Sequence, residues 1–343
     1  MSEIPLAPPA EMVPLLHSLG LELAISPENQ TGHLTALRGG RNNRLWQLQT
    51  QMGPVILKAY CPDARPRLQT EWHFLSHAEK LGLKSVPKPL GYNQNAHLAL
   101  LSWLPGQAIT PEMLQSVHIQ QYLKFLMDLN PPGQDLQAFA PASDSCFSLE
   151  AHLQSLAKRV SAFKTESFFE PEVAELFAHE LLPLWQKIEK DAQDWPHPTH
   201  LFEKASIWLS PSDVGFHNAL LSSEGQLAFV DFEYAGIDHR LKTLADFLTS
   251  VGVPLPVAAL SEIEALLQEL GAHPEERRLF RQLLPLHQLK WCCILMGLFS
   301  PSAVRRRDFA GGLSAASQKR QIARIRAALA RTRQWQHLAF EPV

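Results

Sequence analysis

The sequence predicts an α+β fold in which a small antiparallel β-sheet with one main helix precedes a larger, mostly helical part. Three short extended runs separated by turn residues lie within residues 33–60, and a helical pattern follows them. From residue 111 onward the pattern is mainly helical, interrupted only by a hairpin within residues 207–236. With 343 residues, of which 45% are hydrophobic, the chain can bury a substantial core in two lobes. We expect the lobes to comprise residues 1–102 and 103–343.

The elements of the first lobe follow from the spacing of apolar and turn-forming residues. Apolar residues on one helical face indicate a short helix within residues 9–24. Strands then alternate with glycine-containing turns, and a proline opens the main helix, because proline is favoured in a first helical turn. We expect strands at residues 33–38, 43–50, 54–60 and 97–102, and the main helix at residues 66–81.

The C-terminal segment is strongly basic. Residues 301–343 carry nine Lys or Arg against two acidic residues, a net charge of +7, which leaves −10 for the rest of the chain. Such a tail can bind nucleic acid. However, Ile322, Ile325 and Leu329 recur at helical spacing, and no base-stacking aromatic residues or known binding module accompany the arginines. We therefore expect a terminal helix that packs onto the acidic body, and no nucleic-acid partner.

Composition argues against membrane and disulfide-rich classes of protein. The N-terminus does not resemble a signal peptide, and the apolar run at residues 291–299 is about half as long as a membrane span requires. Four cysteines, two of them adjacent, do not form a disulfide framework. We expect a cytoplasmic protein with reduced thiols and no membrane partner, and the pattern leaves its oligomeric state open.

A lysine and a glutamate in the first lobe are expected to form a pair. Lys58 is the one charge in Val55–Tyr60, a strand whose two faces are both apolar, and a buried lysine needs an anion. Glu71 falls on the apolar face of the main helix, whereas Glu79 lies about 12 Å further along the helix axis and fits less well. Pairing Lys58 with Glu71 satisfies both charges. The alternatives are a surface lysine and a solvated glutamate at a helix edge.

Two carboxylates and an amide lie close together in the middle of the chain. Asp213 and Asn218 are five residues apart, and Asp231 follows in the apolar run Leu227–Phe232. A carboxylate in such a run is costly unless a cation or hydrogen-bond donors satisfy it. Asp and Asn oxygens are ligands that Mg²⁺ accepts together with phosphate oxygens. Asp213 is also compatible with a turn or helix cap, because the residues before it are turn formers.

This arrangement resembles a known enzyme family. An Asp and an Asn five residues apart, followed by an apolar strand that ends in Asp, are similar to the catalytic loop and metal-binding Asp of protein-kinase-like enzymes. Because the second motif reads Val230-Asp231-Phe232-Glu233, the closer resemblance is to the aminoglycoside phosphotransferase and choline kinase-like family, over residues 34–247. It implies a protein-kinase-like two-lobed fold. One departure is Pro211, where the family usually has a histidine.

The resemblance also implies roles for individual residues. Glycines between two strands can bring N–H groups to phosphates, although they often form only a hairpin turn. A tryptophan after the last strand could equally pack at the lobe interface. The implied roles are a catalytic base for Asp213, metal ligands for Asn218 and Asp231, and nucleotide-site residues for Lys58, Glu71, Gly39, Gly40, Ser102, Trp103 and Leu104.

The implied function is ATP-dependent transfer of the γ-phosphoryl group to a hydroxyl of a small molecule, with Mg²⁺ as cofactor. The acceptor, a sugar, amino sugar or amino alcohol, would bind between the catalytic loop and helical segments near residues 120–180 and 275–300. One alternative is a catalytically inactive nucleotide-binding module, which Pro211 suggests. Another is the transfer of a nucleotidyl group to protein.

Overall fold

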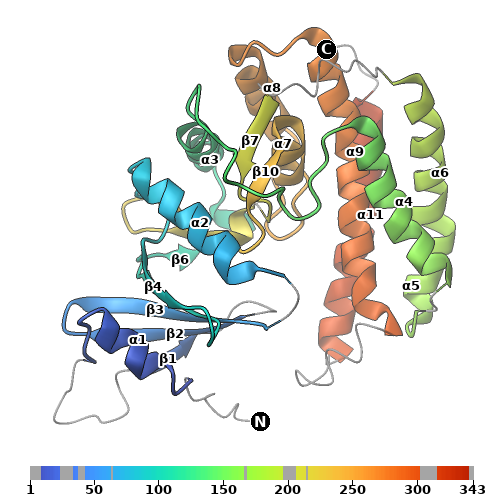
Figure 1. Cartoon of the computed structure of the whole chain (residues 1–343). Helices are drawn as coiled ribbons and strands as arrows, with labels where there is room; N and C mark the ends of the chain where they lie inside the picture. Colours follow the sequence, from blue (N-terminus) through green and yellow to red (C-terminus); the bar gives the residue numbers. More distant parts are fainter. Residues whose placement is uncertain are drawn as a thin grey trace.

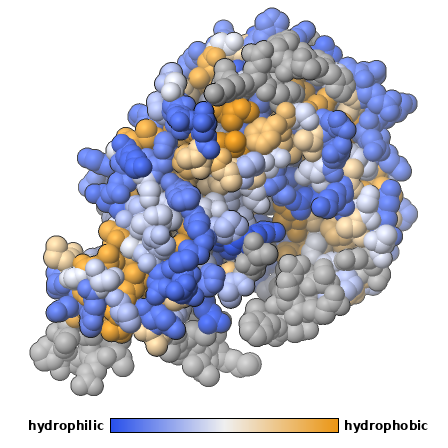
Figure 2. Space-filling model, viewed as in Figure 1, coloured by the Kyte–Doolittle hydropathy of each residue, from blue (hydrophilic) through white to orange (hydrophobic). Residues whose placement is uncertain are grey.

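The computed structural model consists of an antiparallel N-terminal sheet and a helical C-terminal part, so the predicted fold class is confirmed (Figure 1). The surface between the part that carries α2 and the part that carries α9 and α11 is hollowed (Figure 2). The structure describes residues 9–23, 34–37, 43–62, 65–165, 168–195, 206–213, 215–301 and 315–339.

The N-terminal sheet has five antiparallel strands in the order β1-β2-β3-β5-β4. Lys58 lies in the central strand β3, opposite Leu45 of β2 and Ala99 of β5. The sequence did not predict β4, an edge strand whose pairing is irregular between Pro89 and Gly91, as is common where proline enters a sheet. The strands are β1 (Leu34–Leu37), β2 (Asn43–Thr50), β3 (Gly53–Tyr60), β4 (Pro89–Asn93) and β5 (Leu98–Ser102).

Two helices cover opposite faces of this sheet (Figure 1). Helix α1 (Met12–Ser18) packs on the face to which Val55 and Leu57 of β3 contribute. Helix α2 (Arg67–Lys80) packs on the other face, against Tyr60 and the neighbouring strand β5. The predicted period-two alternation of β3 is therefore present, and it directs Lys58 toward α2.

The C-terminal part contains more β-structure than the sequence predicted. Two strands, β7 (Ile207–Ser210) and β10 (Gly236–His239), pair across the whole hairpin region. A second small sheet joins β6 (Gln107–Ala108) to β8 (Ala219–Leu221) and β9 (Leu227–Phe229). The described strands after residue 111 all lie within residues 207–239, where the sequence predicted the interruption of the helices. This region holds two strand pairs rather than one hairpin, because strands of three or four residues are too short to show alternation.

Helices form the remainder of the C-terminal part. They bury a continuous apolar core, which also contains Phe216 from the segment between β7 and β8. The helices are α3 (Ser116–Leu129), α4 (Leu149–Thr165), α5 (Pro171–Leu176), α6 (Leu182–Asp191), α7 (Arg240–Leu248), α8 (Ala259–Glu269), α9 (Pro274–Met296) and α11 (Ala315–Leu338), with a π-helical turn at Phe177–Leu181 and short 3₁₀ turns at Pro111–Met113, Ala192–Asp194, Phe216–Asn218 and Gly297–Phe299.

Within the basic terminal segment, residues 315–338 form a helix that packs on the body, as expected. Helix α11 lies along α9 (Figure 1) and buries Ile325 and Leu329 completely. Its arginines reach acidic residues of other helices, for example Arg326 to Glu172 at 3.0 Å.

Two expectations from composition concern cysteines and membrane spans. All four cysteines are free, and Cys61 alone among them is exposed. Among the helices of the described ranges, none has the length and apolar character that a bilayer crossing requires.

Candidate active site

A buried lysine joins the N-terminal sheet to the loop that follows β9. Lys58 Nζ lies 2.6 Å from Glu71 Oε2 on α2 and 2.6 Å from Asp231 Oδ1. Glu71 Oε2 also accepts a hydrogen bond from the Tyr60 hydroxyl at 2.7 Å, and its Oε1 accepts one from the Phe232 N–H at 3.2 Å. The expected pairing of Lys58 with Glu71 is therefore present. Asp231, from the middle of the chain, completes the cluster.

The charges in this cluster stabilise one another. Burial alone would lower the pKa of Lys58, but Glu71 and Asp231 outweigh burial and raise that pKa above its ordinary value. Burial raises the pKa of Glu71, against the opposing effect of Lys58. Burial and the neighbouring Glu71 also raise the pKa of Tyr60, so its hydroxyl stays a hydrogen-bond donor. The ammonium group of Lys58 thus remains charged and held in place.

The segment between β7 and β8 forms a tight loop around Asp213. Ser212 has a φ of +66°, and the buried ring of Phe216 anchors the loop in the aromatic core. Asn218 Nδ2 donates to the main-chain oxygen of Asp213 at 3.0 Å, and Asn218 O accepts from the N–H of Val230 at 2.9 Å. These bonds fix Asp213 and Asn218 relative to the chain that leads into Asp231.

One pocket brings the three polar residues together. Asp213, Asn218 and Asp231 all line it, over a floor of aromatic side chains that includes Phe125 and Phe229. Asp231 has a φ of +71°, a conformation that a non-glycine residue adopts only where the surroundings require it. The carboxylates predicted from sequence therefore converge, although they lie on opposite sides of a hairpin.

These residues suit a magnesium ion bound together with phosphate oxygens. The Asp231 side chain is 29% exposed, and the Asn218 amide nitrogen is engaged with Asp213, which turns Asn218 Oδ1 away from that carbonyl. The described residues contain no group of three or more His, Cys, Asp or Glu that would hold a metal by themselves. One carboxylate and one amide oxygen fit Mg²⁺, which usually takes its remaining ligands from water and substrate phosphates.

A histidine of the loop between β7 and β8 contacts the Asp213 carboxylate. His217 Nε2 lies 3.3 Å from Asp213 Oδ1. The ring occupies a slot that two glycines leave open: a Cβ at Gly252 would lie 2.6 Å from His217 Cγ, and one at Gly215 would lie 2.7 Å from its Nδ1. With Pro211 at the position of the family histidine, His217 is the imidazole that touches Asp213.

The glutamate of the Val-Asp-Phe-Glu motif ties the same loop to the N-terminal sheet and α2. Glu233 is 4% exposed and accepts hydrogen bonds from Asn43 Nδ2 at 2.6 Å and from Arg67 Nη1 at 2.5 Å. Arg67 Nη1 also donates to the Tyr234 hydroxyl at 2.6 Å. Sequence reasoning had noted Glu233 only as a departure from the protein-kinase motif. An acidic residue two positions after Asp231 was the available signal.

The remaining residues of the expected nucleotide site lie at the end of β5 or outside the described chain. Ser102 is the last residue of β5, about 10 Å along the strand from Ala99, the partner of Lys58. The Ser102 N–H donates a hydrogen bond to Lys88 O. The backbone groups that would bind a nucleotide base therefore belong to Trp103 and Leu104, which are both half-buried. Gly39 and Gly40 lie outside the described residues.

Asp246, on α7, lies in the helical part and is almost fully buried. Its carboxylate binds Lys242 at 2.7 Å and Lys290 at 2.5 Å, and it accepts a hydrogen bond from His287 at 2.7 Å. All three partners are side chains of α7 and α9. Asp246 therefore organises a buried polar cluster in the helical part.

The phosphotransferase enzyme family is the family whose sequence pattern matches this chain, over residues 33–280. The match spans the Lys58 strand, α2 and the loops of Asp213 and Asp231. The chain belongs to the phosphotransferase enzyme family. The resemblance to aminoglycoside phosphotransferases and choline kinases is thereby confirmed at the level of the family. No curated protein matches the chain by sequence.

Solved structures with the same fold include a choline/ethanolamine kinase family protein and two antibiotic phosphotransferases. A choline/ethanolamine kinase family protein from Mesorhizobium loti is 18% identical with a TM-score of 0.56, covering 93% of this chain and 98% of the other. Macrolide 2′-phosphotransferase from Brachybacterium faecium is 17% identical with a TM-score of 0.57, covering 92% and 97%. A spectinomycin phosphotransferase bound to ADP and spectinomycin is 11% identical with a TM-score of 0.54, covering 88% and 93%.

Proposed function

We propose that this phosphotransferase family member is an ATP-dependent kinase that phosphorylates a hydroxyl of a small molecule. The observation that carries the proposal is the contact of Lys58 with both Glu71 and Asp231, beside a pocket that Asp213 and Asn218 share with Asp231. The proposal assigns phosphate binding to Lys58, metal binding to Asn218 and Asp231, and the role of base to Asp213, and their proximity supports it. The ADP complex of a structural neighbour supports the choice of nucleotide.

In this proposal the residues position groups and neutralise charge, as phosphoryl transfer requires. Asp213 orients the acceptor hydroxyl and takes its proton, while the hydroxyl oxygen bonds to the γ-phosphorus and the bond to the bridging oxygen of ADP breaks. Lys58, held by Glu71, binds phosphate oxygens. Asn218 and Asp231 would hold Mg²⁺, which neutralises developing phosphate charge.

The two parts of the chain then divide the work. Residues 1–102 form the nucleotide-binding lobe, in which Gly39 and Gly40 contact phosphates and Ser102, Trp103 and Leu104 approach the base. Residues 103–343 carry the catalytic loop and the acceptor site. We place the protein in the cytoplasm, where ATP and Mg²⁺ are available.

The test is ADP formation from ATP and Mg²⁺ over a panel of sugars, amino sugars and amino alcohols. Acceptor-dependent ADP formation should occur and should fall by about 10²–10⁴-fold in an Asp213→Asn variant. Asp128→Asn, in an exposed residue of α3, is the matched control. ATP binding without turnover on any acceptor would instead identify an inactive nucleotide-binding module. Addition of AMP to protein, detected by mass spectrometry, would identify nucleotidyl transfer.

A further inference from the structure

The chain between α7 and α8 packs against the loop between β7 and β8. This chain, the 249–258 segment, forms neither helix nor strand. A Cβ at Gly252 would lie 2.6 Å from His217 Cγ. On the other side of the contact, a Cβ at Gly215 would lie 2.5 Å from Ser250 Oγ. The two pieces of chain therefore touch so closely that neither glycine has room for an added methyl group.

His217 lies between the 249–258 segment and Asp213. Its Nε2 is 3.3 Å from Asp213 Oδ1. Its Cβ, Cγ and Nδ1 all lie within 2.7 Å of the point that a Cβ of Gly252 would occupy. The 249–258 segment thus closes one side of the slot that holds the imidazole. If this segment moved away, the ring would be free to rotate out of contact with Asp213.

Two arginines of α11 donate hydrogen bonds to main-chain oxygens of the 249–258 segment. Arg324 Nη2 lies 3.1 Å from Val251 O, the carbonyl just before the glycine that contacts the imidazole. Arg331 Nη2 donates to Leu255 O. Burial lowers the pKa of Arg331 only to about 10, so this guanidinium stays charged at pH 7. Hydrogen bonds from charged donors are the stronger kind, and the segment has no helical or strand hydrogen bonds of its own to fix its course.

Helix α11 is itself fixed along α9. Gln321 Nε2 donates to Leu295 O at 3.2 Å, and Trp335 Nε1 donates to Gln288 Oε1 at 3.2 Å. Gln321 and Trp335 are both buried, and they lie about 21 Å apart along the axis of α11. The helix therefore cannot slide along α9 without breaking both bonds.

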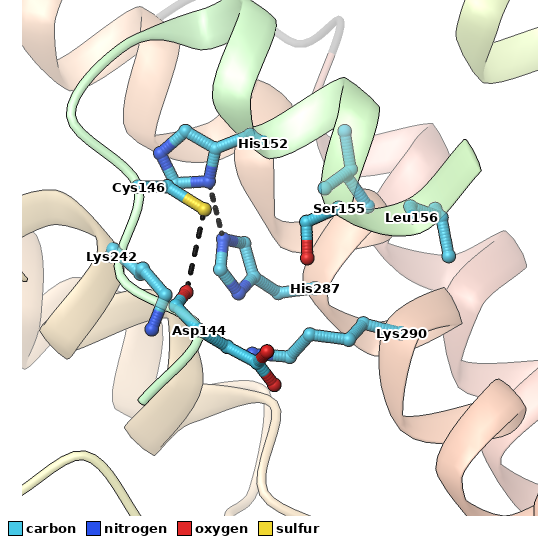
Figure 3. Close-up of a pocket in the computed structure, with 9 residues that line it drawn as sticks. Asp144, Cys146, His152, Ser155, Leu156, Lys242, His287 and Lys290 are labelled. Atoms are coloured by element: carbon cyan, nitrogen blue, oxygen red, sulfur yellow. Dashed lines mark hydrogen bonds between the residues drawn. The ribbon is translucent and has the colours of Figure 1, made fainter. Parts of the chain in front are cut away.

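A buried polar cluster joins α9 to α7, the helix that leads into the 249–258 segment. Asp246 of α7 lies 2.7 Å from His287 and 2.5 Å from Lys290, which are both on α9. Figure 3 shows Lys242 of α7, His287 and Lys290 around the small pocket that α4, α7 and α9 line. Helices α7, α9 and α11 thus form one frame, from which the arginines of α11 reach the segment.

We propose that Arg324 and Arg331 are positioning residues for the phosphoryl transfer. They hold the 249–258 segment in place, so that His217 keeps the Asp213 carboxylate in the orientation that accepts the proton. This inference rests on the proposed kinase function and adds a contribution of α11 to that same site. Both arginines lie C-terminal to the residues that the family pattern matches. The activity should therefore depend on a helix that the family pattern does not include.

The first test replaces Arg324 by methionine in the full-length protein and measures ADP formation with an acceptor from the panel. The 249–258 segment can then shift away from His217, so kcat should fall about 10-fold with the KM for ATP unchanged, below the roughly 10²-fold that a 1 Å misplacement can cost. Arg324→Lys, which keeps a charged donor, should recover part of the loss, and Arg324→Met/Arg331→Met should lose more. Arg326→Met, in an exposed ion pair of the same helix, is the matched control and should keep the wild-type kcat.

A double-mutant cycle tests whether Arg324 acts through His217. In a His217→Gln background, Arg324→Met should cost less than about 3-fold in kcat, because the effects of residues that act through one another do not add. An additive loss would mean that Arg324 affects turnover by another route, and it would overturn the inference.

Hydrogen–deuterium exchange gives a readout that does not require turnover. Peptides that cover residues 249–256 should exchange faster in Arg324→Met than in the wild type and in Arg326→Met. Urea unfolding measures the global stability of each variant, and a purely structural role would lower activity only in proportion to the folded fraction.

The outcomes separate this inference from the proposed function. A kcat of Arg324→Met equal to that of Arg326→Met, unchanged exchange of residues 249–256, or a loss of activity explained by the folded fraction would each overturn the inference, and the kinase function would stand. If the wild type turns over no acceptor, the proposed function fails, and the exchange experiment still decides whether the arginines hold the segment.

Discussion

Replacement of Lys58 by methionine tests the buried charge cluster most directly. The lysine side chain is 4% exposed, and its ammonium lies 2.6 Å from a carboxylate that is 1% exposed and from one that is 29% exposed. Removing one partner of a buried ion pair costs about 3–5 kcal/mol. Glu71 keeps its bonds from Tyr60 and Phe232, and Asp231 can hydrate, so we expect a loss of about 3 kcal/mol in the free energy of unfolding.

The loss should depend on pH in a defined direction. Without the lysine, the native pKa of Glu71 rises further above its unfolded value, so the native state binds more protons than the unfolded state. The penalty is then largest at high pH and shrinks as pH falls. Urea unfolding at pH 8 and pH 5.5 should show a smaller gap between variant and wild type at the lower pH.

Two further variants complete the experiment. In the double variant Lys58→Met/Glu71→Gln the uncompensated charge is absent, so it should be more stable than Lys58→Met alone by about 1 kcal/mol or more. Lys84→Met, at an exposed position, should change stability by no more than about 0.5 kcal/mol. If Lys58→Met costs no more than Lys84→Met at either pH, the cluster does not stabilise the native protein and the reasoning is refuted.

Three other perturbations test neighbouring features. Gly252→Ala places a methyl group 2.6 Å from His217, so kcat should fall several-fold with the KM for ATP unchanged. An unaltered kcat would show that His217 does not position Asp213. Glu233→Gln leaves the buried Arg67 without its carboxylate and should cost about 2–4 kcal/mol in urea unfolding, whereas a neutral result would mean that the network is not stabilising. Burial lowers the pKa of His287 from 6.5 to about 4, so between these pH values the unfolded state binds more protons than the native state. Roughly 3 kcal/mol of the free energy of unfolding should therefore be lost as pH falls from 6.5 to 4. His287→Gln should show a shallower decline, and an equal decline would contradict the assignment.

The first lobe was largely predictable because local patterns determine it. Strand β2 has the bounds that the alternation and flanking turns indicated, and the pairing of Lys58 with Glu71 followed from two adjacent elements with buried faces. Strand β4 was missed because its residues do not alternate. The β7–β10 pair joins segments far apart in the sequence, and no local periodicity encodes that contact.

Some contacts of the candidate active site were also predictable from the sequence, and others were not. The spacing of Asp213, Asn218 and Asp231 pointed to a shared site, and the structure brings these residues into one pocket. The approach of His217 to Asp213 depends on two glycines, one of which lies in a distant segment. The hydrogen bonds of Glu233 with Asn43 and Arg67 join segments far apart in the sequence. They therefore depend on tertiary packing rather than on sequence pattern.

The pairing of α9 with α11 affects how this chain can be shortened. The family match ends at residue 280, inside α9, whereas the core of that helix continues through Leu283 and Leu289 and is closed by Trp335, which is fully buried. A fragment cut at the family boundary would expose an apolar surface and would be prone to aggregate. Domain fusions and minimal active fragments should therefore retain the chain through residue 339.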